Sequence, residues 1–308
     1  MFLTPKRAAL SAAVLLTLPF TCTQALEAQE FVIIDNQFDT NKYAGIYQPA
    51  GNFDSDISIT TGTLPEGHSR IYGVVTNNTI TFNGNINIDA NASSLAAMAY
   101  GFRAETGSNA TLLGNTIIHA STLTATKGND GNAVGVLANN GTIDMSKGNT
   151  DITIDVGSSR PFGFQLVGGT NETSATVGKT NIKINLHDKN ASDTEIRWAQ
   201  GIYAANASFI AKDDVSISFN GIGTNGALLD LGETVIRGVN LEGSAYNTNA
   251  QFDKNLSIAV NGKGYEVYGV YVSGDTLSST DLHAGANIEG TLSININGAF
   301  EFVNGGTR

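Results

Sequence analysis

The feature that most constrains this chain is a short segment built around a glycine, which recurs along its length. The clearest copy opens the stretch from Arg70 to Ala90, where three short segments alternate apolar and polar residues and are separated by Asn or Gly. Alternation places every second side chain on one face, as in a β-strand, and Asn and Gly accept the left-handed backbone of tight turns. We therefore interpret this stretch as three strands joined by tight corners.

Eight copies of this unit can be aligned on the glycine of the first strand, which we call the marker glycine. The marker glycines are Gly45, Gly73, Gly101, Gly135, Gly163, Gly201, Gly238 and Gly269. They stand 28 to 38 residues apart, a spacing that suits three short strands and one loop of variable length. Because one such coil cannot bury its apolar face alone, its copies are expected to stack on each other.

The repeat length alone also fits helical repeats and propeller blades, so the residue pattern has to decide between them. No window carries a sustained helical stripe, and Asn and Gly recur too often for long helices. A propeller blade needs four antiparallel strands, whereas only three segments recur here. The sequence therefore predicts an all-β protein, a right-handed parallel β-helix of about eight three-strand rungs. The most variable loops, at 188–198, 241–249 and 273–290, are the protrusions where we expect binding residues.

The first residues have the features of a secretory signal peptide. Lys6 and Arg7 precede an apolar run that is too short to span a bilayer, and small residues of a cleavage site follow it. We therefore divide the chain into a signal peptide, residues 1–25, and a β-helix domain, residues 26–308. Cys22, the only cysteine, falls within the signal peptide, so the mature domain is expected to contain no disulfide.

The formal net charge of the chain is −11. Removing Lys6 and Arg7 with the signal peptide gives −11 − 2 = −13, because no acidic residue precedes Glu27. Such a surface repels phosphate backbones and anionic lipids, which argues against binding to nucleic acid or directly to a membrane surface. No later segment is apolar for long enough to form a membrane-spanning helix.

A secretory signal followed by cysteine-free repeats rich in Asn, Gly and Thr resembles the passenger region of a Gram-negative autotransporter of the type V secretion route. The resemblance is carried by segments such as Tyr-Gly-Val, Asn-Ala-Ser-Phe and Asp-Val-Ser-Ile-Ser, at residues 72–74, 206–209 and 214–218. It covers the chain from about Gln29 to its end. Membership would imply a surface-exposed or released β-helix that is exported through an outer-membrane barrel.

The sequence departs from this family at its end, because it lacks the C-terminal translocator barrel. Residues 300–308 follow directly on a predicted strand, where another rung would be expected. We therefore expect a fragment, a truncated product or one partner of a split system. It would reach the cell surface or outer membrane if a barrel is supplied elsewhere, and otherwise stay in the periplasm. Its last rung would be an uncapped sheet edge.

Residue types that carry chemistry are scattered, and we predict no catalytic, cofactor-binding or metal-binding residues. The four histidines are His68, His119, His187 and His283. They are far apart in sequence and are interpreted as solvent-facing or loop residues. The aspartates that a polysaccharide-cleaving β-helix could use are Asp54, Asp56, Asp151, Asp213 and Asp214. We expect each at a corner, where Asp serves turn formation, and no Arg or His partner accompanies them.

Two further motifs have a simpler explanation beside the functional one. Gly274-Asp275-Thr276-Leu277 resembles the Gly-Asp-Ser-Leu box of a lipase family, but Thr276 replaces the nucleophilic serine, which favours a loop tip. Trp198, the only tryptophan, follows Arg197 beside a polar insertion. Together they could stack on a sugar ring, although packing at the edge of a rung is the simpler interpretation. Asn-x-Ser/Thr sites, such as the one at Asn206, are interpreted as turn residues in stacked Asn ladders.

Three hypotheses for the function remain open. The leading one is a non-enzymatic, adhesin-like passenger whose side wall or loops contact host or cell-surface glycans, matrix proteins or neighbouring cells, with no small-molecule substrate. The second is a polysaccharide lyase or hydrolase, in which Asp and Lys or Arg from successive rungs would converge in one groove. The third is a structural stalk with no binding role of its own.

Overall fold

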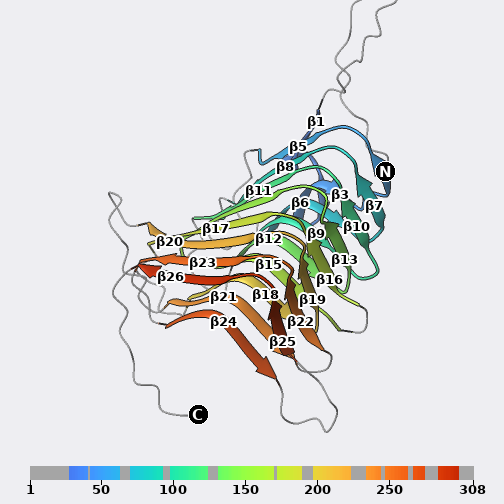
Figure 1. Ribbon diagram of the computed structural model, residues 1–308. Helices are drawn as coiled ribbons and strands as arrows, with labels where there is room; N and C mark the ends of the chain where they lie inside the picture. Colours follow the sequence, from blue (N-terminus) through green and yellow to red (C-terminus); the bar gives the residue numbers. More distant parts are fainter. Residues whose placement is uncertain are drawn as a thin grey trace, which may run out of the picture.

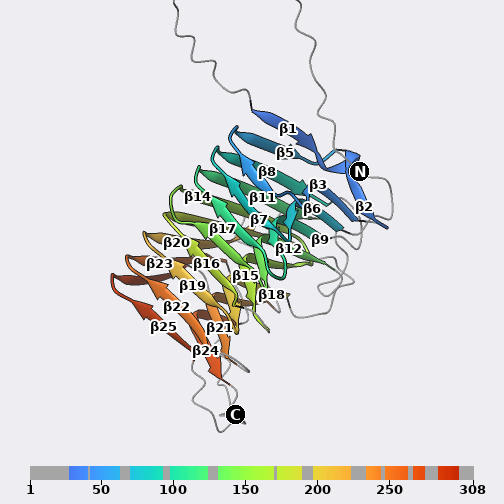
Figure 2. The same ribbon diagram turned by 90° about the vertical axis from the view of Figure 1, so that its right-hand side faces the viewer.

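The chain forms a stack of coils in which each rung contributes one strand to each of three sheets (Figure 1). The computed structural model describes residues 28–40, 42–62, 70–92, 98–123, 131–169, 172–188, 197–222, 234–243, 247–262, 266–274 and 284–297. Seen from the side, the sequence runs steadily from one end of the stack to the other (Figure 2). The predicted parallel β-helix is confirmed, and the described residues hold eight complete three-strand rungs.

Neighbouring strands within each sheet come from successive rungs. Sheet A contains, in stacking order, β1 (Gln29–Val32), β5 (Ile57–Thr60), β8 (Ile86–Asn91), β11 (Thr116–Thr122), β14 (Thr150–Val156), β17 (Thr180–His187), β20 (Val215–Ile222), β23 (Leu256–Asn261) and β26 (Leu292–Asn297). Sheet B contains β2 (Gln37–Asp39), β3 (Lys42–Tyr47), β6 (Arg70–Thr76), β9 (Met98–Ala104), β12 (Asn132–Asn139), β15 (Arg160–Val167), β18 (Arg197–Ala205), β21 (Thr234–Gly243) and β24 (Glu266–Gly274). Sheet C contains β4 (Gly51–Phe53), β7 (Thr79–Phe82), β10 (Asn109–Leu112), β13 (Thr142–Met145), β16 (Ser174–Val177), β19 (Ser208–Ala211), β22 (Thr248–Phe252) and β25 (Ala284–Ile288). The first rung is preceded by a short 3-10 helix, η1 (Ile33–Asp35), and by β2, which pairs antiparallel with β3.

The core is built on a ladder of eight isoleucines that face the eight marker glycines. The isoleucines are Ile59, Ile88, Ile118, Ile152, Ile182, Ile217, Ile258 and Ile294, and they pair in register along sheet A. All but Ile294 are at most 1% exposed. Because burial of an isoleucine side chain contributes about 1.5–3 kcal/mol, this ladder stabilises every rung except the last in the same way.

The marker glycines, which all lie in sheet B, allow sheets A and B to approach each other closely. A Cβ atom built on any marker glycine would lie closer than 3.0 Å to a methyl carbon of the facing isoleucine. For Gly135 it would also meet the carbonyl oxygen of Gly163 in the next rung at 2.7 Å. Only a residue without a side chain fits here, which is the physical reason for the repeat seen in the sequence.

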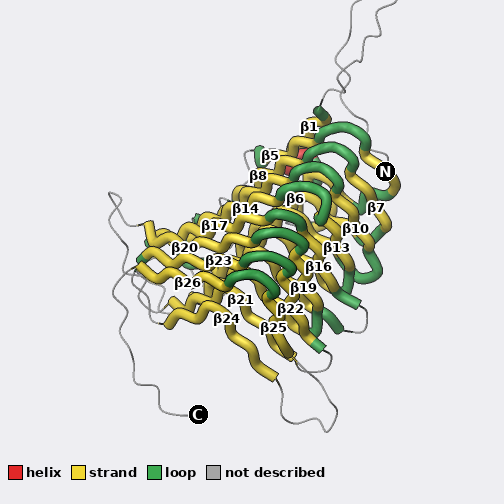
Figure 3. The backbone as a smooth tube through the Cα atoms, in the orientation of Figure 1, coloured by secondary structure: helices red, strands yellow, loops and turns green. Residues whose placement is uncertain are grey.

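The corner between sheets C and A is a tight turn in every rung, visible as the short loops in Figure 3. The backbone N–H of Asn85 donates to Asp56 Oδ1 at 2.7 Å, and that of Asn115 donates to Asn85 Oδ1 at 2.9 Å. Asn149 continues the series by donating to Asn115 Oδ1 at 3.0 Å. A stacked Asn and Asp ladder therefore satisfies backbone donors of this corner, although its residues are not the Asn-x-Ser/Thr sites for which ladders were predicted.

The three predicted loops are shorter than expected, because residues at their ends belong to strands. Residues 197–198 belong to β18, residues 241–243 to β21 and residues 273–274 to β24. A complete strand, β25, lies within the predicted loop 273–290, because its first three residues are Ala, Gly and Ala, which carry little strand signal. The predicted signal peptide and residues 300–308 lie outside the described residues. Among the described residues, no helix has the length and apolar character needed to cross a membrane.

Candidate functional site

The outer face of sheet B carries aromatic side chains where polar ones would be expected. At each marker glycine the chain turns two successive residues inward, so the residue before the glycine and the residue two after it both point outward. We call this surface the aromatic face. Its leading row, before the glycines, is Ala44, Tyr72, Tyr100, Val134, Phe162, Gln200, Arg237 and Tyr268. Its trailing row, two after the glycines, is Tyr47, Val75, Arg103, Leu137, Gln165, Tyr203, Asn240 and Tyr271.

Several of these residues form a hydrophobic cluster that is separate from the central core. Its buried members are Ala44, Tyr72, Val75, Tyr100, Val134, Leu137 and Phe162. Burial raises the pKa of Tyr100 above its ordinary value, as expected for a phenol that has lost contact with water. The cluster occupies the first half of the aromatic face and links two depressions, one at each end.

The first depression has a volume of about 200 Å³. Its lining residues are Phe38, Lys42, Tyr47, Gln48, Arg70, Tyr72, Val75, Asn77, Arg103 and Glu105. The ring of Phe38 stacks on that of Tyr47, with a centroid separation of 4.2 Å. The guanidinium of Arg103 lies 5.3 Å from the centroid of the Tyr72 ring, and its Nε lies 2.6 Å from Glu105 Oε1. Aromatic, cationic and acidic groups therefore meet in one open hollow.

The second depression repeats this combination at the other end of the face, with a volume of about 380 Å³. Its lining residues are Arg160, Phe162, Gln165, Trp198, Gln200, Tyr203, Arg237, Glu242, Tyr271 and Ser273. Arg237 lies between two rings, 4.6 Å from the Trp198 centroid and 3.9 Å from the Tyr271 centroid. Glu242 accepts a hydrogen bond from the hydroxyl of Tyr203 at 2.9 Å and lies 3.5 Å from Arg237. These contacts hold the aromatic rings in fixed positions.

Such depressions suit a ligand that is both amphipathic and rich in hydrogen-bonding groups. An aromatic ring offers a flat apolar surface, on which the C–H side of a sugar ring can stack. Arginine supplies up to five N–H donors, and a glutamate carboxylate supplies acceptors. A carbohydrate uses all three kinds of contact at once. The open shape of both depressions favours part of a long chain over an enclosed small molecule.

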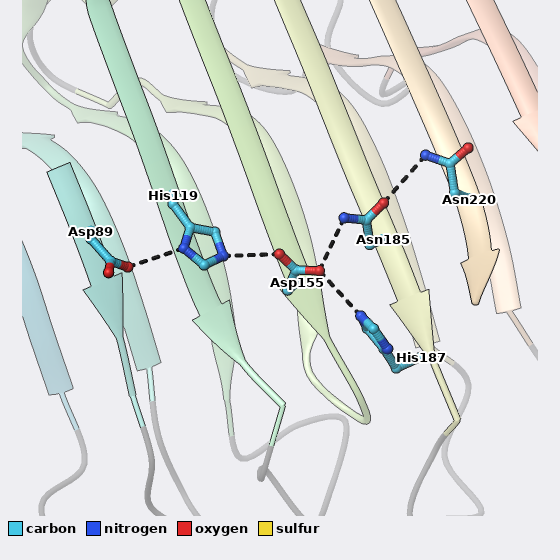
Figure 4. A network of polar contacts seen from close by, with 6 residues as sticks. All are labelled: Asp89, His119, Asp155, Asn185, His187 and Asn220. Carbon is cyan, nitrogen blue, oxygen red and sulfur yellow. Dashed lines mark hydrogen bonds and ion pairs between the residues drawn. The ribbon is translucent and has the colours of Figure 1, made fainter. Parts of the chain in front are cut away.

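The outer face of sheet A has a different character, which we call the polar face. At its centre His119 lies between two carboxylates, with Nδ1 3.0 Å from Asp89 Oδ1 and Nε2 2.9 Å from Asp155 Oδ2 (Figure 4). Asp155 also accepts hydrogen bonds from Asn185 at 3.0 Å and from His187 at 3.1 Å. Because both ring nitrogens of His119 face a carboxylate, the geometry requires the doubly protonated, positively charged imidazole.

The contacts in this network raise the pKa of His119 and lower the pKa of Asp155. The hydrogen bond to Asp155 raises the pKa of His119, burial of the ring opposes the shift, and the charge of Asp89 adds to it. Burial works against ionisation of Asp155, but hydrogen bonds from His119, His187 and Asn185 outweigh it and lower the pKa to about 2. The network is therefore an ionised pair of Asp155 and His119 around mildly acidic pH.

The network continues as a ladder of amides toward the end of the stack. Asn220 donates to Asn185 at 3.3 Å, Asn261 donates to Asn220 at 2.9 Å, and Asn297 donates to Asn261 at 3.1 Å. Together with Asp89, His119 and Asp155, these residues bridge seven neighbouring strands of sheet A. Their hydrogen-bonding groups are used between rungs, which indicates a structural role for the polar face.

The prediction that the histidines are solvent-facing or loop residues without partners is only partly right. His119 and His187 lie on the outer face of the stack, as expected, but both are paired with Asp155, a contact that the sequence did not predict. The reason is that 36 and 32 residues separate these partners, and only the register of the rungs brings them together. His68 and His283 lie outside the described residues. Within the described part of the chain, no group of three or more His, Cys, Asp or Glu residues is arranged to hold a metal ion.

Four of the five singled-out aspartates lie at the corner between sheets C and A, as predicted. Asp56 and Asp214 accept backbone hydrogen bonds from Asn85 and Asn255 in the next rung. Asp54 accepts from the Asn83 amide at 2.6 Å, and Asp213 accepts from the backbone N–H of Asp214 at 2.8 Å. These carboxylates serve the turns. The prediction for Asp151 was wrong, because it lies within β14 and accepts from Asn181 at 2.7 Å.

The alternative in which Trp198 and Arg197 stack together on a sugar ring is excluded. Arg197 is fully buried on the other side of its strand, where it donates to the backbone carbonyls of Gly157 and His187. Trp198 instead contacts Arg237 of the neighbouring strand. Adjacent residues of a strand point to opposite faces, so Arg197 and Trp198 could not act together. Of the lipase-like box, Gly274 ends β24 and residues 275–277 lie outside the described residues.

No protein-family model matches the chain, and neither a curated protein nor a solved structure matches it. The two outer faces are therefore interpreted from their own chemistry.

Proposed function

We propose that this protein is a non-enzymatic binding protein of the adhesin type, whose aromatic face contacts carbohydrate on a host or neighbouring cell. The observation that carries the proposal is the recurrence of one combination at two places on a single face. In each depression an arginine lies against aromatic rings and close to a glutamate. A solvent-facing strand with only a structural role would carry polar residues there, as sheet A does.

The resemblance of the sequence to autotransporter passengers supports the same proposal. It suggests export through a type V secretion route and a place at the cell surface. On such a scaffold the side wall is the largest area that can meet another surface, and weak contacts at two sites would add up. The alternative of a structural stalk is less favoured, because a stalk gains nothing from partly exposed rings such as Tyr47, which is 37% exposed.

A glycan array probed with the purified protein tests this proposal. We expect binding to one class of glycan, and we expect the Tyr47→Ala, Tyr271→Ala double variant to lose it. Ile117→Ala is the matched control, because Ile117 is 51% exposed on the outer face of sheet A. No binding to any glycan, or equal loss in the control, would contradict the proposal.

The enzymatic alternative is tested with the same ligand. A polysaccharide lyase or hydrolase would shorten its ligand, whereas a binding protein releases it at its original length. After long incubation of the protein with a bound glycan, size-exclusion chromatography should recover the glycan intact. Shortened products that disappear in the double variant would favour the enzyme.

A further inference from the structure

The charged residues of the aromatic face indicate which class of glycan it would bind. Four of the five described arginines lie on this face, in or beside the two depressions. They are Arg70, Arg103, Arg160 and Arg237. The fifth, Arg197, is fully buried. Arginine rather than lysine is the residue that recognises carboxylate and sulfate groups with two parallel hydrogen bonds.

The lining of each depression is locally positive on a chain of net charge −11. In the first depression, Lys42, Arg70 and Arg103 stand against Glu105 and against Asp39, which forms an ion pair with Lys42. Arg160 and Arg237 stand against Glu242 in the second depression. An anionic ligand is therefore repelled by the rest of the surface and attracted to this face, which guides its approach.

The two depressions also lie on one line along the stack. Arg70 and Arg160 both stand three residues before a marker glycine, in β6 and β15, so they occupy the same row of sheet B. Three strand spacings separate them, which corresponds to about 14 Å. The cluster residues Tyr100, Val134 and Phe162 pair in register between the two arginines, and all three are at most 7% exposed. A straight chain that contacts both depressions would pass over this buried cluster.

We propose that the aromatic face binds a linear acidic glycan, which lies along the axis of the β-helix and contacts both depressions at once. Its sugar rings would stack on the aromatic side chains, and its carboxylate or sulfate groups would pair with Arg70 and Arg160. This inference rests on the proposed carbohydrate-binding function and adds to it the charge and the direction of the ligand. A densely charged polymer such as DNA fits less well, because the net charge of the chain repels a continuous phosphate backbone.

Isothermal titration calorimetry with size-graded oligogalacturonides or hyaluronan oligosaccharides tests the inference on the full chain. We expect affinity to rise by about tenfold or more once the chain is long enough to reach both depressions, because the second contact is then intramolecular. Methyl esterification of the carboxylates should lower the affinity about tenfold or more at equal length, since it removes the charge and leaves the sugar rings in place.

Charge-removing variants locate the contact. Arg70→Gln and Arg160→Gln should each reduce long-chain binding to the level of a short chain. Lys183→Gln is the matched control, because Lys183 lies in sheet A and its substitution removes the same charge from the other face. Thermal unfolding of all three variants should match the wild type, which separates loss of binding from loss of the fold.

Each contrary outcome overturns a different part of the account. Equal affinity for the methyl ester would exclude an acidic ligand and leave a carbohydrate-binding face. Affinity independent of chain length would exclude the axial placement. Equal binding of a DNA oligonucleotide would replace the glycan by a general polyanion. The absence of binding to every glycan would remove the proposed function itself.

Discussion

The outer faces of sheets A and B rest on the same core but are built from opposite chemistry. On sheet A, the network that starts at Asp89 and His119 consists of carboxylates, imidazoles and amides that bond to each other from rung to rung. On sheet B, the equivalent outward rows hold tyrosines, a tryptophan and arginines around two depressions. The hydrogen-bonding groups of the polar face bond to each other within the protein, whereas the aromatic face presents partly exposed rings such as Tyr47. This contrast is the basis of our proposal that sheet A holds the stack together and that sheet B meets a ligand.

The largest effect is expected from a change that damages both faces through their shared core. In Gly135→Ala the new methyl group would overlap Ile152 and the carbonyl oxygen of Gly163. Overpacking of this kind costs about 1–3 kcal/mol or more, so the variant should unfold at clearly lower urea concentration. Gly285→Ala is the matched control, because a Cβ at Gly285 meets nothing within 4 Å. Equal stability of the two variants would contradict the glycine and isoleucine ladder.

A smaller effect, confined to one face, is expected from Tyr271→Ala. The variant should lose its contact with Arg237, which costs about 0.5–1.5 kcal/mol of folding stability. Glycan binding should weaken about tenfold or more, because this ring lines the second depression. Ile117→Ala on the polar face should change neither quantity by more than about 0.5 kcal/mol. Titration calorimetry and urea unfolding of the pair decide whether the two faces differ in function.

The smallest effect is a pH dependence that belongs to the polar face alone. The carboxyl of Asp155, with its pKa lowered to about 2, stabilises the fold above its ordinary pKa of about 3.9, and this contribution is lost as the pH falls toward 2. Since the pKa of His119 is raised, its contribution is present below its ordinary pKa of about 6.5 and is lost as the pH rises. The stability contributions of Asp155 and His119 are therefore both present near pH 5.

The Asp155→Asn variant measures this contribution. Its loss of stability relative to wild type should be greater at pH 5 than at pH 8, and below about 1 kcal/mol because 38% of the His119 side chain is exposed. Glycan binding should be unchanged, since the network lies on the other face. A larger loss at pH 8 than at pH 5 would show that His119 is neutral in the folded protein.

The fold was predictable because it depends on a local pattern repeated in every rung. Each marker glycine is followed by an aliphatic or aromatic residue, and each of the eight sheet A strands from β5 to β26 alternates around its isoleucine. These features need no knowledge of which rung lies next to which. The eight marker glycines identified in the sequence accordingly all lie in sheet B, one in each rung.

The two faces could not be predicted in the same way, because they depend on register between rungs. Trp198 contacts Arg237, and His119 contacts Asp155, across neighbouring rungs. Because the loops between rungs differ in length, the sequence alone does not show which residues lie side by side. The aromatic residues before the marker glycines were visible in the sequence. Their outward direction became clear only from the bend that turns two successive residues inward at each glycine.

The fluorescence of Trp198 tests the central claim most directly, because it is the only tryptophan of the chain and lines the second depression. Titration with an acidic oligosaccharide should shift or quench its emission in a saturable way, with an unchanged midpoint in Asp155→Asn and with a midpoint at about tenfold or more higher ligand concentration in Tyr271→Ala. A glycan that binds by calorimetry without altering Trp198 emission would place the binding site elsewhere and contradict the account.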